Sequence, residues 1–430
     1  MKVLMFGWEF PPHIAGGLGT ACYGLTKGLA YHGVKTHFVV PKAYGDEDQS
    51  QITLHAAEGV EYNETNFNFG QYYEQLNYIE VGSNIIPYLS PEEFEILVSK
   101  EIARDTTKKE KILERKFKFA GAYGSNLMLE VSRYAMVASV IARKLDFDVI
   151  HAHDWLTYAA GVAAKRATGK PLVVHMHATE YDRSGDNVNP HVYNIERMGM
   201  SEADLVITVS NFTRQIVINK YGIDPNKVMT VHNAVEPDEK EIGQINKNLP
   251  EKIVTFLGRV TYQKGPEYFV ESAVKVLQKD PNVRFVMAGS GDMLNRIILQ
   301  VATLGIADKF HFTGFLKGAE VTKMFTQSDV YVMPSVSEPF GISPLEAMRS
   351  NVPVIISKQS GVSEVLKHAV KVDYWDTDAM ADAIYGLLQY KSLSKMFKIL
   401  GKDEVDNLKW DNSAAKVIKV YEEAILRTKK

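Results

Sequence analysis

Residues 337–348 read Ser-Glu-Pro-Phe-Gly-Ile-Ser-Pro-Leu-Glu-Ala-Met, and the segments on either side of them differ in character. The apolar run 330–334 before them predicts a buried strand, and the Ala/Met/Leu segment after them predicts a helix with Pro344 in its first turn. A strand, a loop with glycine and proline, and a helix start thus follow one another. Such a loop points backbone N–H groups outward at the positive end of a helix dipole, where anions bind favourably.

Two glutamates flank this loop. Glu338 stands before it and Glu346 stands inside the helix, with seven residues between them. One carboxylate therefore lies over any ligand that the loop holds, and the other lies one to two turns further along. Two carboxylates suit a polyhydroxylated ligand, because they accept hydrogen bonds from hydroxyl groups. By spacing alone, a helix acid and a solvated surface glutamate explain the pair too.

The whole segment closely resembles the signature of the family 4 retaining glycosyltransferases, which include relatives of glycogen synthase and sucrose synthase, and the flanking residues 329–334 match as well. The resemblance implies an α/β protein of the GT-B fold. In this fold two Rossmann-like doubly wound domains face each other across a cleft, and a C-terminal helix crosses back to the first domain. The resemblance also implies that Glu338 lies by the donor sugar and that Glu346 holds the ribose of the sugar nucleotide.

Length and composition limit the class of protein. The chain has 430 residues, a net charge of −3 and one cysteine, Cys22. This length suits two domains, and the nearly balanced charge gives no reason to expect a nucleic acid partner. A single cysteine excludes an internal disulfide framework and fits a reducing compartment. A strand-like run follows Met1 in place of a signal peptide, and no apolar segment is long enough to span a membrane. We therefore expect a cytoplasmic protein.

A Gly-rich loop follows the first predicted strand, 3–6. The paired glycines Gly16 and Gly17 precede a predicted helix over 20–31. They allow a backbone to approach a diphosphate closely, although a tight turn explains them equally well. In the resembled family this loop lies against the donor phosphates. Glycogen synthases of the bacterial type carry a lysine two places before the paired glycines, and this chain has Ile14 there. That departure argues against a phosphate contact from a side chain of this loop and against the narrow glycogen synthase assignment.

Residues from about 45 to 121 have the least regular pattern, and we interpret them as an insertion that serves acceptor recognition. Their basic run, 108–118, interleaves apolar and basic residues. It predicts a solvated helix face, because Glu110 and Glu114 interrupt it. Contact with a membrane surface or an anionic partner is the alternative.

A predicted strand over 149–152 ends in His153-Asp154-Trp155. In open α/β sheets, ligands bind at the carboxyl ends of the strands. The trio resembles one in glycogen synthases, which implies that His153 faces the donor sugar and the acceptor. Because side chains alternate along a strand and no third cluster of ligands is apparent, we predict no metal site.

The next predicted strand, 171–177, ends in His177, and the resemblance places this histidine at the cleft. Arg183 follows shortly after it. Its guanidinium can hold an anionic acceptor, or it can pair with Asp182 or Glu180.

The polar stretch 236–252 has the composition of a linker and divides the chain. Beyond it, a predicted strand over 253–257 leads to Arg259 and Lys264, and a helix is predicted over 266–278. Two cations and a helix N-terminus suit a diphosphate, while two solvent-exposed basic residues are the simpler explanation. The pair matches the family's Gly-Arg…Lys-Gly signature, which implies that it neutralises the leaving diphosphate.

The resemblance also implies further donor contacts and a division into domains. Two residues would frame the nucleobase, and three backbone positions of the loop would bind the donor: Phe315 and Leu316, and Phe340, Gly341 and Ile342. The expected domains are an N-terminal acceptor-side domain, a C-terminal domain that binds the sugar nucleotide, and a returning helix: 1–235, 251–408 and 409–430.

These expectations combine into a retaining hexosyltransferase. It would move a hexose, in the first place glucose, from UDP-glucose or ADP-glucose to a carbohydrate acceptor, in the first place an α-glucan, without a cofactor or a metal. The residues expected to act in catalysis are Glu338, His153, Arg259 and Lys264. Transfer to a small sugar, a sugar phosphate or a lipid-linked acceptor is the alternative within this class. A phosphorylase-like enzyme and a non-catalytic glucan-binding protein are the alternatives from other classes.

Overall fold

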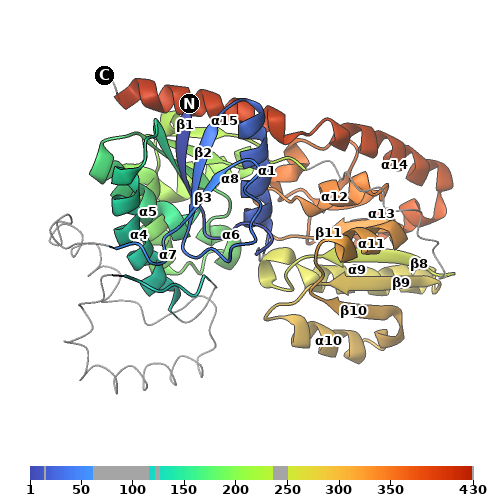
Figure 1. The fold of residues 1–430 in the computed structure, drawn as a ribbon. Helices are drawn as coiled ribbons and strands as arrows, with labels where there is room; N and C mark the ends of the chain where they lie inside the picture. The colour runs from blue at the N-terminus through green and yellow to red at the C-terminus, as the bar shows by residue number, and fades with distance from the viewer. Residues whose placement is uncertain (14–15, 62–115, 122–125, 236–249, 429–430) are drawn as a thin grey trace, which may run out of the picture.

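Two parallel sheets form the framework of the computed structural model, which describes residues 1–13, 16–61, 116–121, 126–235 and 250–428 (Figure 1). The first sheet has seven strands in the order β3-β2-β1-β4-β5-β6-β7, and the second has six in the order β10-β9-β8-β11-β12-β13. In each sheet the chain starts in the middle, adds strands toward one edge and then adds strands toward the other. This is the strand order of a doubly wound, Rossmann-like domain. The predicted fold class is confirmed.

The strands of the first sheet are β1 (Lys2–Phe6), β2 (Lys35–Val40), β3 (Thr53–Ala56), β4 (Val149–His153), β5 (Leu172–Met176), β6 (Leu205–Thr208) and β7 (Val228–Thr230). Those of the second are β8 (Lys252–Leu257), β9 (Val283–Ala288), β10 (Phe310–Gly314), β11 (Val330–Met333), β12 (Val354–Ser357) and β13 (Val370–Val372).

The helices of the first domain are α1 (Gly17–Tyr31), α4 (Leu127–Lys144), α5 (Trp155–Thr168), α6 (Glu180–Ser184), α7 (Pro190–Glu202), α8 (Asn211–Tyr221) and the 3₁₀ helix η3 (Pro225–Lys227). Those after them are η4 (Tyr262–Lys264), α9 (Pro266–Lys279), α10 (Leu294–Thr303), η5 (Ala307–Lys309), α11 (Ala319–Gln327), α12 (Ser343–Arg349), η6 (Gly361–Glu364), α13 (Thr377–Gln389), α14 (Lys391–Asp406) and α15 (Trp410–Thr428).

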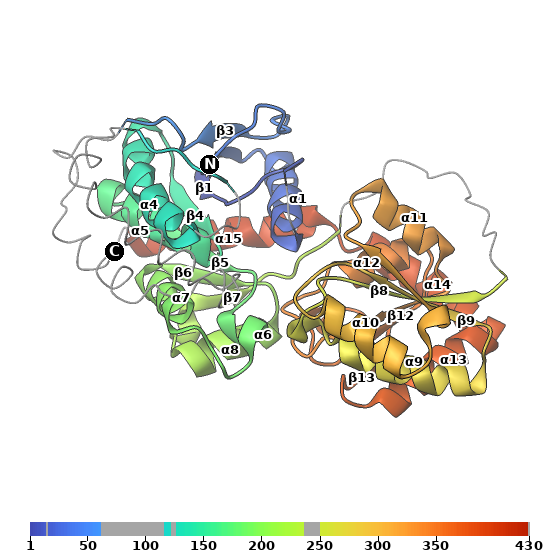
Figure 2. The same ribbon diagram turned by 90° about the horizontal axis from the view of Figure 1, so that it is seen from below.

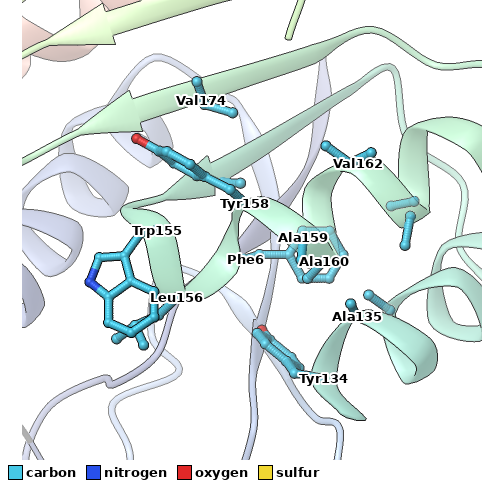
Figure 3. Packing of buried hydrophobic residues seen from close by; sticks show 14 of the residues in the cluster. Phe6, Tyr134, Ala135, Trp155, Leu156, Tyr158, Ala159, Ala160, Val162 and Val174 are labelled. Atoms are coloured by element: carbon cyan, nitrogen blue, oxygen red, sulfur yellow. The ribbon is translucent and has the colours of Figure 1, made fainter. Parts of the chain in front are cut away.

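The core of the first domain lies on both faces of its sheet. Leu4 and Phe6 of β1 belong to a cluster with Tyr134 of α4 and with Trp155 and Tyr158 of α5 (Figure 3). Val3 and Met5 of β1, which alternate with them, belong to a second cluster with α1 and α15. A sheet that is covered on both faces buries every side chain of its strands, which is why β1 and β6 read as apolar runs.

The C-terminal helix α15 follows α14 of the second domain and packs on α1 of the first (Figures 1 and 2). A Cβ on Gly24 would lie 2.1 Å from Trp410 Nε1, and one on Gly28 would lie 2.6 Å from the Trp410 carbonyl oxygen. Two glycines four residues apart share one face of a helix. They therefore give α1 a flat surface against which α15 lies, and the predicted crossing back to the first domain is present.

Several elements of the structure lack a counterpart among the predicted ones, and β3 and α14 illustrate why. β3 lies within the region 45–121 and pairs in parallel with β2, but it is a half-exposed edge strand of four residues and gives no apolar run. α14 has no side-chain cap at its N-terminus and mixes lysines with apolar residues, so its start carries no sequence signal.

Several predictions fall on residues outside the description. Ile14 and residues 62–115, which hold most of the predicted insertion and of the basic run 108–118, lie outside the described residues. β7 ends at Thr230 and β8 begins at Lys252, and the domain boundaries stay predictions. None of the described helices is both long enough and apolar enough to cross a membrane.

Candidate active site

The carboxyl ends of the two sheets meet, and predicted site residues lie on both sides of the junction. His153 ends β4 and His177 follows β5 directly, while Glu338 follows β11. The two sides touch where the Ser337 hydroxyl donates a hydrogen bond to Asp182 Oδ1 at 2.6 Å. The short helices α6 and η4 are also in contact. The strand ends of both domains therefore contribute to one site.

Lys264 and Glu338 form an ion pair on the second-domain side. Lys264 Nζ lies 2.5 Å from Glu338 Oε2, and 21% and 9% of the two side chains are exposed. The Ser335 hydroxyl donates to the same carboxylate oxygen at 3.3 Å. The structure thus brings together two of the predicted catalytic residues. The contact of Lys264 with a diphosphate stays a prediction.

Arg259 lies exposed at the end of β8. Its guanidinium donates one long hydrogen bond, to Gln263 Oε1 at 3.4 Å, and no ion pair joins it to the rest of the described residues. The loop that carries it rests on Gly289, where a Cβ would lie 1.8 Å from the Gly258 carbonyl oxygen. The Gly-Ser-Gly turn of the sequence therefore supports this loop by close backbone contact. The Arg259 guanidinium, which is always charged, thus faces solvent from a supported loop.

Gly341 sets the shape of the loop between β11 and α12. Its φ is +99°, a conformation that residues with a Cβ rarely adopt, and a Cβ there would lie 3.1 Å from Met333 Sδ and 3.2 Å from Glu338 Cγ. The next residue back, Phe340, is buried, and its carbonyl oxygen accepts a hydrogen bond from Val362 N at 2.7 Å. The loop therefore holds Glu338 in one place.

Gly16 and Gly17 stand at the start of α1, the first as its N-cap and the second as its first residue. A Cβ on either would meet no heavy atom of the described residues within 4 Å. Packing inside the described chain therefore does not explain these two glycines, in contrast to Gly24. Both glycines are exposed, in keeping with the predicted approach of a phosphate, while the Gly19 N–H already donates to Glu9 Oε1 at 3.2 Å.

His153 and His177 contact each other on the first-domain side, with His153 Nδ1 2.9 Å from His177 Nε2. Burial, followed by the neighbouring histidines, lowers the pKa of His153 well below its usual value, so its imidazole is neutral at neutral pH. Burial also lowers the pKa of His177, against the effect of Asp154. The second ring nitrogen of His153, Nε2, is buried and has no hydrogen-bond partner among the described residues. His153 is fully buried in this structure, so its contact with the donor sugar or the acceptor stays a prediction.

Asp154 determines the path of the chain after β4 and β5. Its φ of 61° and ψ of 170° lie in a region that glycine alone adopts readily. Its Oδ1 accepts hydrogen bonds from His177 N at 2.9 Å and from Ala178 N at 3.3 Å. Backbone strain of this kind costs about 1–3 kcal/mol and is concentrated at functional sites. These bonds tie the ends of the two strands together beside the histidine pair.

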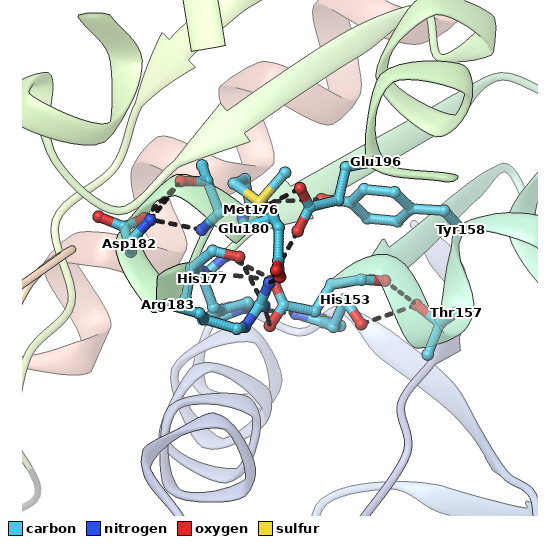
Figure 4. Close-up of polar contacts among 12 residues, drawn as sticks. His153, Thr157, Tyr158, Met176, His177, Glu180, Asp182, Arg183 and Glu196 are labelled. Atoms are coloured by element: carbon cyan, nitrogen blue, oxygen red, sulfur yellow. Dashed lines mark hydrogen bonds and ion pairs between the residues drawn. The ribbon is translucent and has the colours of Figure 1, made fainter. Parts of the chain in front are cut away.

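Arg183 is surrounded by carboxylates of its own domain (Figure 4). Its NH1 lies 2.9 Å from Glu196 Oε1 and 3.4 Å from Glu180 Oε2, and its NH2 lies 3.7 Å from Asp154 Oδ2. NH2 also donates to the Ala178 carbonyl oxygen at 2.8 Å. Of the interpretations open from the sequence, the pairing with Glu180 is observed. Contact of Arg183 with an anionic acceptor stays a prediction, and three carboxylates already neutralise its charge.

Glu196 is fully buried behind Arg183. Burial raises the pKa of Glu196 to about 7, although the charge of Arg183 and a hydrogen bond from the Tyr221 hydroxyl oppose the rise. This carboxyl group therefore titrates near neutral pH. It contacts Arg183, which in turn contacts Asp154 beside the histidine pair.

The first domain also holds the loop that carries Glu338. Ser210, the N-cap of α8, donates a hydrogen bond from its hydroxyl to the Pro339 carbonyl oxygen at 2.6 Å, and the Thr213 hydroxyl reaches the same oxygen at 3.4 Å. With the bond from Ser337 to Asp182, two residues next to Glu338 are bonded across the domain boundary.

Glu364 of η6 adds a second bridge between the domains. It accepts hydrogen bonds from Asn211 N at 2.9 Å and Phe212 N at 2.6 Å, the first turn of α8, and His232 Nε2 lies 2.9 Å from its Oε2. Burial of Glu364 opposes its ionisation, but these hydrogen bonds outweigh burial and lower its pKa. A charged acceptor at a helix N-terminus is favourable. The bridge therefore stabilises the arrangement in which the domains touch.

The remaining predicted donor contacts lie at the second sheet. Phe315 is 53% exposed, with Lys317 Nζ 5.6 Å from its ring centroid, and Leu316 beside it is half-buried. They follow β10, which is three places from β11 in the sheet. Glu346 lies half-buried in the first turn of α12, and Ile342 packs partly buried against the core. Their contacts with the donor stay predictions.

Three groups of described side chains have ligand atoms near enough to one another for a metal ion: His151, His153 and His175; Cys22, His153 and His177; and His13, Asp46 and Glu47. The first group is buried, but the rings of His151 and His175 are parallel within 7° at a centroid distance of 5.4 Å. Lone pairs of parallel rings run side by side and do not converge on one point. The expectation of a metal-free enzyme stays a prediction.

Sequence reasoning missed the residues that support the site across the fold: Asp154, Asp182, Ser210, Ser337 and Glu364. The sequence did point to Asp154, because it is the middle residue of the His-Asp-Trp trio that resembles one in glycogen synthases. The others are ordinary polar residues whose partners lie 129 to 155 positions away in the chain, so spacing could not reveal them.

The arrangement suits a ligand with an anionic part and a hydroxylated part. An exposed guanidinium, an ammonium group and an accessible helix start offer contacts to the anion. The Glu338 carboxylate offers a contact to hydroxyl groups. Because these groups come from both domains, a ligand that bridged them would favour the arrangement in which the domains touch.

Two family models match consecutive parts of the chain. Residues 102–239 match the model described as Glycosyltransferase Family 4, and residues 237–403 match the model described as Glycosyl transferases group 1. The first match ends and the second begins where β7 has ended and β8 has yet to start.

Similar proteins include one that matches nearly the whole length of the chain. An uncharacterised glycosyltransferase of Methanocaldococcus jannaschii is 29% identical over 99% of this chain and 99% of its own. The alpha-maltose-1-phosphate synthase of Mycolicibacterium smegmatis is 29% identical over 64% of this chain and 78% of its own. Among solved structures, HepE of Anabaena in complex with UDP and glucose has a TM-score of 0.68 at 15% identity, over 98% of this chain and 100% of its own, which shows a shared fold.

Proposed function

Since the chain belongs to the family 4 glycosyltransferases, we propose that it is a retaining enzyme that transfers glucose from a nucleoside diphosphate sugar to a carbohydrate. The observation that supports this most is the Lys264–Glu338 ion pair at the carboxyl end of the second sheet, where the exposed Arg259 also lies. A nucleotide sugar combines a diphosphate with a polyhydroxylated ring. These three side chains offer cations to the first and a carboxylate to the second.

Charge separates during the transfer, and we assign the two cations, Arg259 and Lys264, to the negative charge on the diphosphate. The bond between the anomeric carbon and the diphosphate oxygen breaks, so positive charge develops on the carbon and negative charge on the diphosphate. In our proposal Arg259 and Lys264 stabilise the departing diphosphate, together with backbone N–H groups at Gly17 and in the loop after β11. Lys264 then lies between the Glu338 carboxylate and the diphosphate, and Glu338 is free to accept hydrogen bonds from the sugar.

Retention of configuration requires the acceptor oxygen to bond the anomeric carbon on the face that the diphosphate leaves. The departing phosphate oxygen is then close enough to take the proton of the acceptor hydroxyl, so no separate base is required. His153 has a different role in this proposal. Its unpartnered Nε2 holds a hydroxyl of the donor sugar or of the acceptor, and a neutral imidazole does so without adding charge.

UDP-glucose is the proposed donor and an α-glucan the first proposed acceptor. The Anabaena structure in complex with UDP and glucose supports this donor, although at 15% identity it shares only the fold. The name of the Mycolicibacterium smegmatis relative supports transfer of glucose, since maltose is a disaccharide of glucose. The same name favours a second candidate acceptor, a phosphorylated sugar, because the product it describes carries a phosphate.

Nucleotide release tests the proposal. UDP-glucose, ADP-glucose and GDP-mannose are each incubated with the purified protein and with glycogen, maltose or glucose 1-phosphate. We expect release from a glucose nucleotide that glycogen or maltose stimulates. Stimulation by the sugar phosphate alone would select the second candidate.

A matched pair of lysine variants separates the proposed role from general effects of charge. Lys264→Ala should abolish release, while Lys279→Ala should not, because Lys279 lies at the C-terminal end of α9 in an exposed pair with Asp382. Equal activity of the two variants, or no release from any donor, would contradict the proposal.

A further inference from the structure

Helix α14 has an inner row of side chains that fixes it to the second domain. Phe397, Gly401 and Val405 follow one another at intervals of four residues, which places them on one face. Val405 is buried, Phe397 packs against the core, and a Cβ on Gly401 would lie 2.8 Å from Met348 Cε of α12. The inner row thus packs α14 against α12 and α13, and the opposite side of α14 faces away from the domain (Figure 1).

A second row, on the outward side, is apolar. Its four side chains are exposed by 37%, 44%, 57% and 39%: Leu393, Met396, Ile399 and Leu400. Their spacing of three, three and one residues makes them a continuous strip along the helix. Single exposed apolar residues are ordinary, but a strip of four marks a contact surface.

A third row consists of lysines: Lys391, Lys395, Lys398 and Lys402. Their spacing of four, three and four residues keeps them in one line, which by helical geometry lies between the inner row and the apolar strip. Within the described part of the chain, none of these four ammonium groups has a carboxylate within ion-pair distance. We call the apolar and lysine rows together the α14 face.

We propose that the α14 face docks this protein on a membrane surface that contains anionic lipids. A helix that lies in the plane of a membrane buries apolar side chains at the boundary of the acyl chains and keeps lysines at the phosphate groups. Lys402 Nζ donates a hydrogen bond to the Arg349 carbonyl oxygen at 3.3 Å, but none of the four lysines is neutralised by an ion pair within the described residues, so the row complements a negative surface. The apolar strip enters the boundary of the bilayer, so this docking needs no helix that crosses the membrane.

Other partners match only half of this surface. A second copy of the chain could cover the apolar strip, but pairing of two α14 faces would bring two lysine rows together, with Asp403 and Asp406 as the exposed acids of each helix. A nucleic acid would match the lysines and leave the apolar strip exposed to water. An anionic bilayer matches both rows at once. The proposal does not depend on which donor or acceptor the enzyme uses.

Vesicle flotation of the full chain tests the proposal. Vesicles of equal parts phosphatidylglycerol and phosphatidylcholine are compared with vesicles of phosphatidylcholine alone, at low and high salt. We expect binding to the anionic vesicles that weakens as salt screens the lysines. Lys395→Gln with Lys398→Gln should weaken binding about thirtyfold, because each lysine near an anionic surface contributes about fivefold. Met396→Ser with Ile399→Ser should weaken it at least as much.

A matched control lies on α10. Ile298 and Leu299 are exposed by 42% and 67%, but the nearby cation, Arg296, is paired with Glu267. Ile298→Ser with Leu299→Ser should leave vesicle binding unchanged. Circular dichroism and nucleotide release confirm that each variant is folded, since none of the substituted residues belongs to the proposed site.

Three results would overturn the proposal. The first is no binding to anionic vesicles, and the second is an equal loss of binding in the α10 control. The third is a dimer in light scattering that the α14 substitutions dissociate, which would assign the α14 face to a second copy.

Discussion

Replacing Glu364 by glutamine tests whether the bridge between the domains supports catalysis. The substitution keeps the size of the side chain and removes its charge. In the structure this carboxylate accepts two backbone N–H groups at the start of α8 and faces His232, all of them in the other domain. A glutamine offers one acceptor oxygen and turns an NH₂ group toward the remaining donors.

The size of the effect follows from these three contacts. A hydrogen bond to a charged group contributes about 1.5–3 kcal/mol and a neutral one about 0.5–1.5 kcal/mol, so each backbone bond loses about 1 kcal/mol. The helix dipole adds about 0.3–1 kcal/mol, but 22% of the Glu364 side chain is exposed and solvent screens part of the total. We therefore expect the closed arrangement to lose about 2 kcal/mol, which is about thirtyfold in the closure equilibrium.

Steady-state kinetics with a saturating acceptor measure this loss. We expect kcat to fall by about tenfold to thirtyfold, while donor binding to the second domain, measured by calorimetry with UDP, changes by less than about threefold. Small-angle X-ray scattering should show a larger radius of gyration. An unchanged kcat together with an unchanged radius of gyration would refute the reasoning.

Glu404 provides a control with nearly the same local contacts. Its carboxylate accepts Lys367 N at 2.7 Å and His368 N at 2.8 Å, and His368 Nδ1 lies 3.1 Å from it, all within the second domain. Glu404→Gln should lower the free energy of unfolding of that domain and leave kcat unchanged. A loss of kcat equal to that of Glu364→Gln would mean that general destabilisation causes both.

Four further predictions concern the site. Arg259→Ala and Glu338→Gln should each lower turnover about a hundredfold or more with the fold intact, because each removes a contact to developing charge or to the sugar; wild-type rates would remove them from the site. His153→Ala should lower transfer far more than it weakens nucleotide binding, and equal losses would make its role structural. The pKa of Glu196 is raised to about 7 in the folded state, so its contribution to stability is complete below its usual value and is lost as pH rises through 7. Urea titrations from pH 5 to 8 should therefore show wild type losing stability relative to Glu196→Gln, and parallel curves would contradict the shift. Dialysis against EDTA should leave turnover unchanged, and a loss that a divalent ion restores would contradict the metal-free mechanism.

Local patterns predicted the framework of the molecule well. The run into residues 337–348 became β11, its loop and α12, because apolar runs, a glycine and a proline act within a few residues of one another. The same holds for the start of the chain, where β1 and α1 flank the paired glycines. The strand order followed from the family resemblance, since spacing alone does not say which strands are neighbours.

Contacts between distant residues could not be predicted from the same patterns. Lys264 and Glu338 lie 74 positions apart, and their side chains meet because η4 and the β11 loop occupy neighbouring strand ends. Arg183 illustrates the opposite case. Its sequence neighbour Glu180 was a correct partner, while Glu196, 13 positions away, is the nearer one. The four contacts of the Arg183 guanidinium depend on how the chain packs, and the spacing of residues in the sequence does not reveal packing.

The configuration of the first product tests the central claim most directly. UDP-glucose, in which glucose is bound through its α-anomer, is incubated with the protein and the best acceptor from the release assay, and the new linkage is assigned by proton NMR before side reactions occur. The account predicts an α-linked glucose, together with one UDP released for each linkage formed. A β-linked product would contradict the retaining mechanism, and UDP release without any new linkage would contradict the transfer itself.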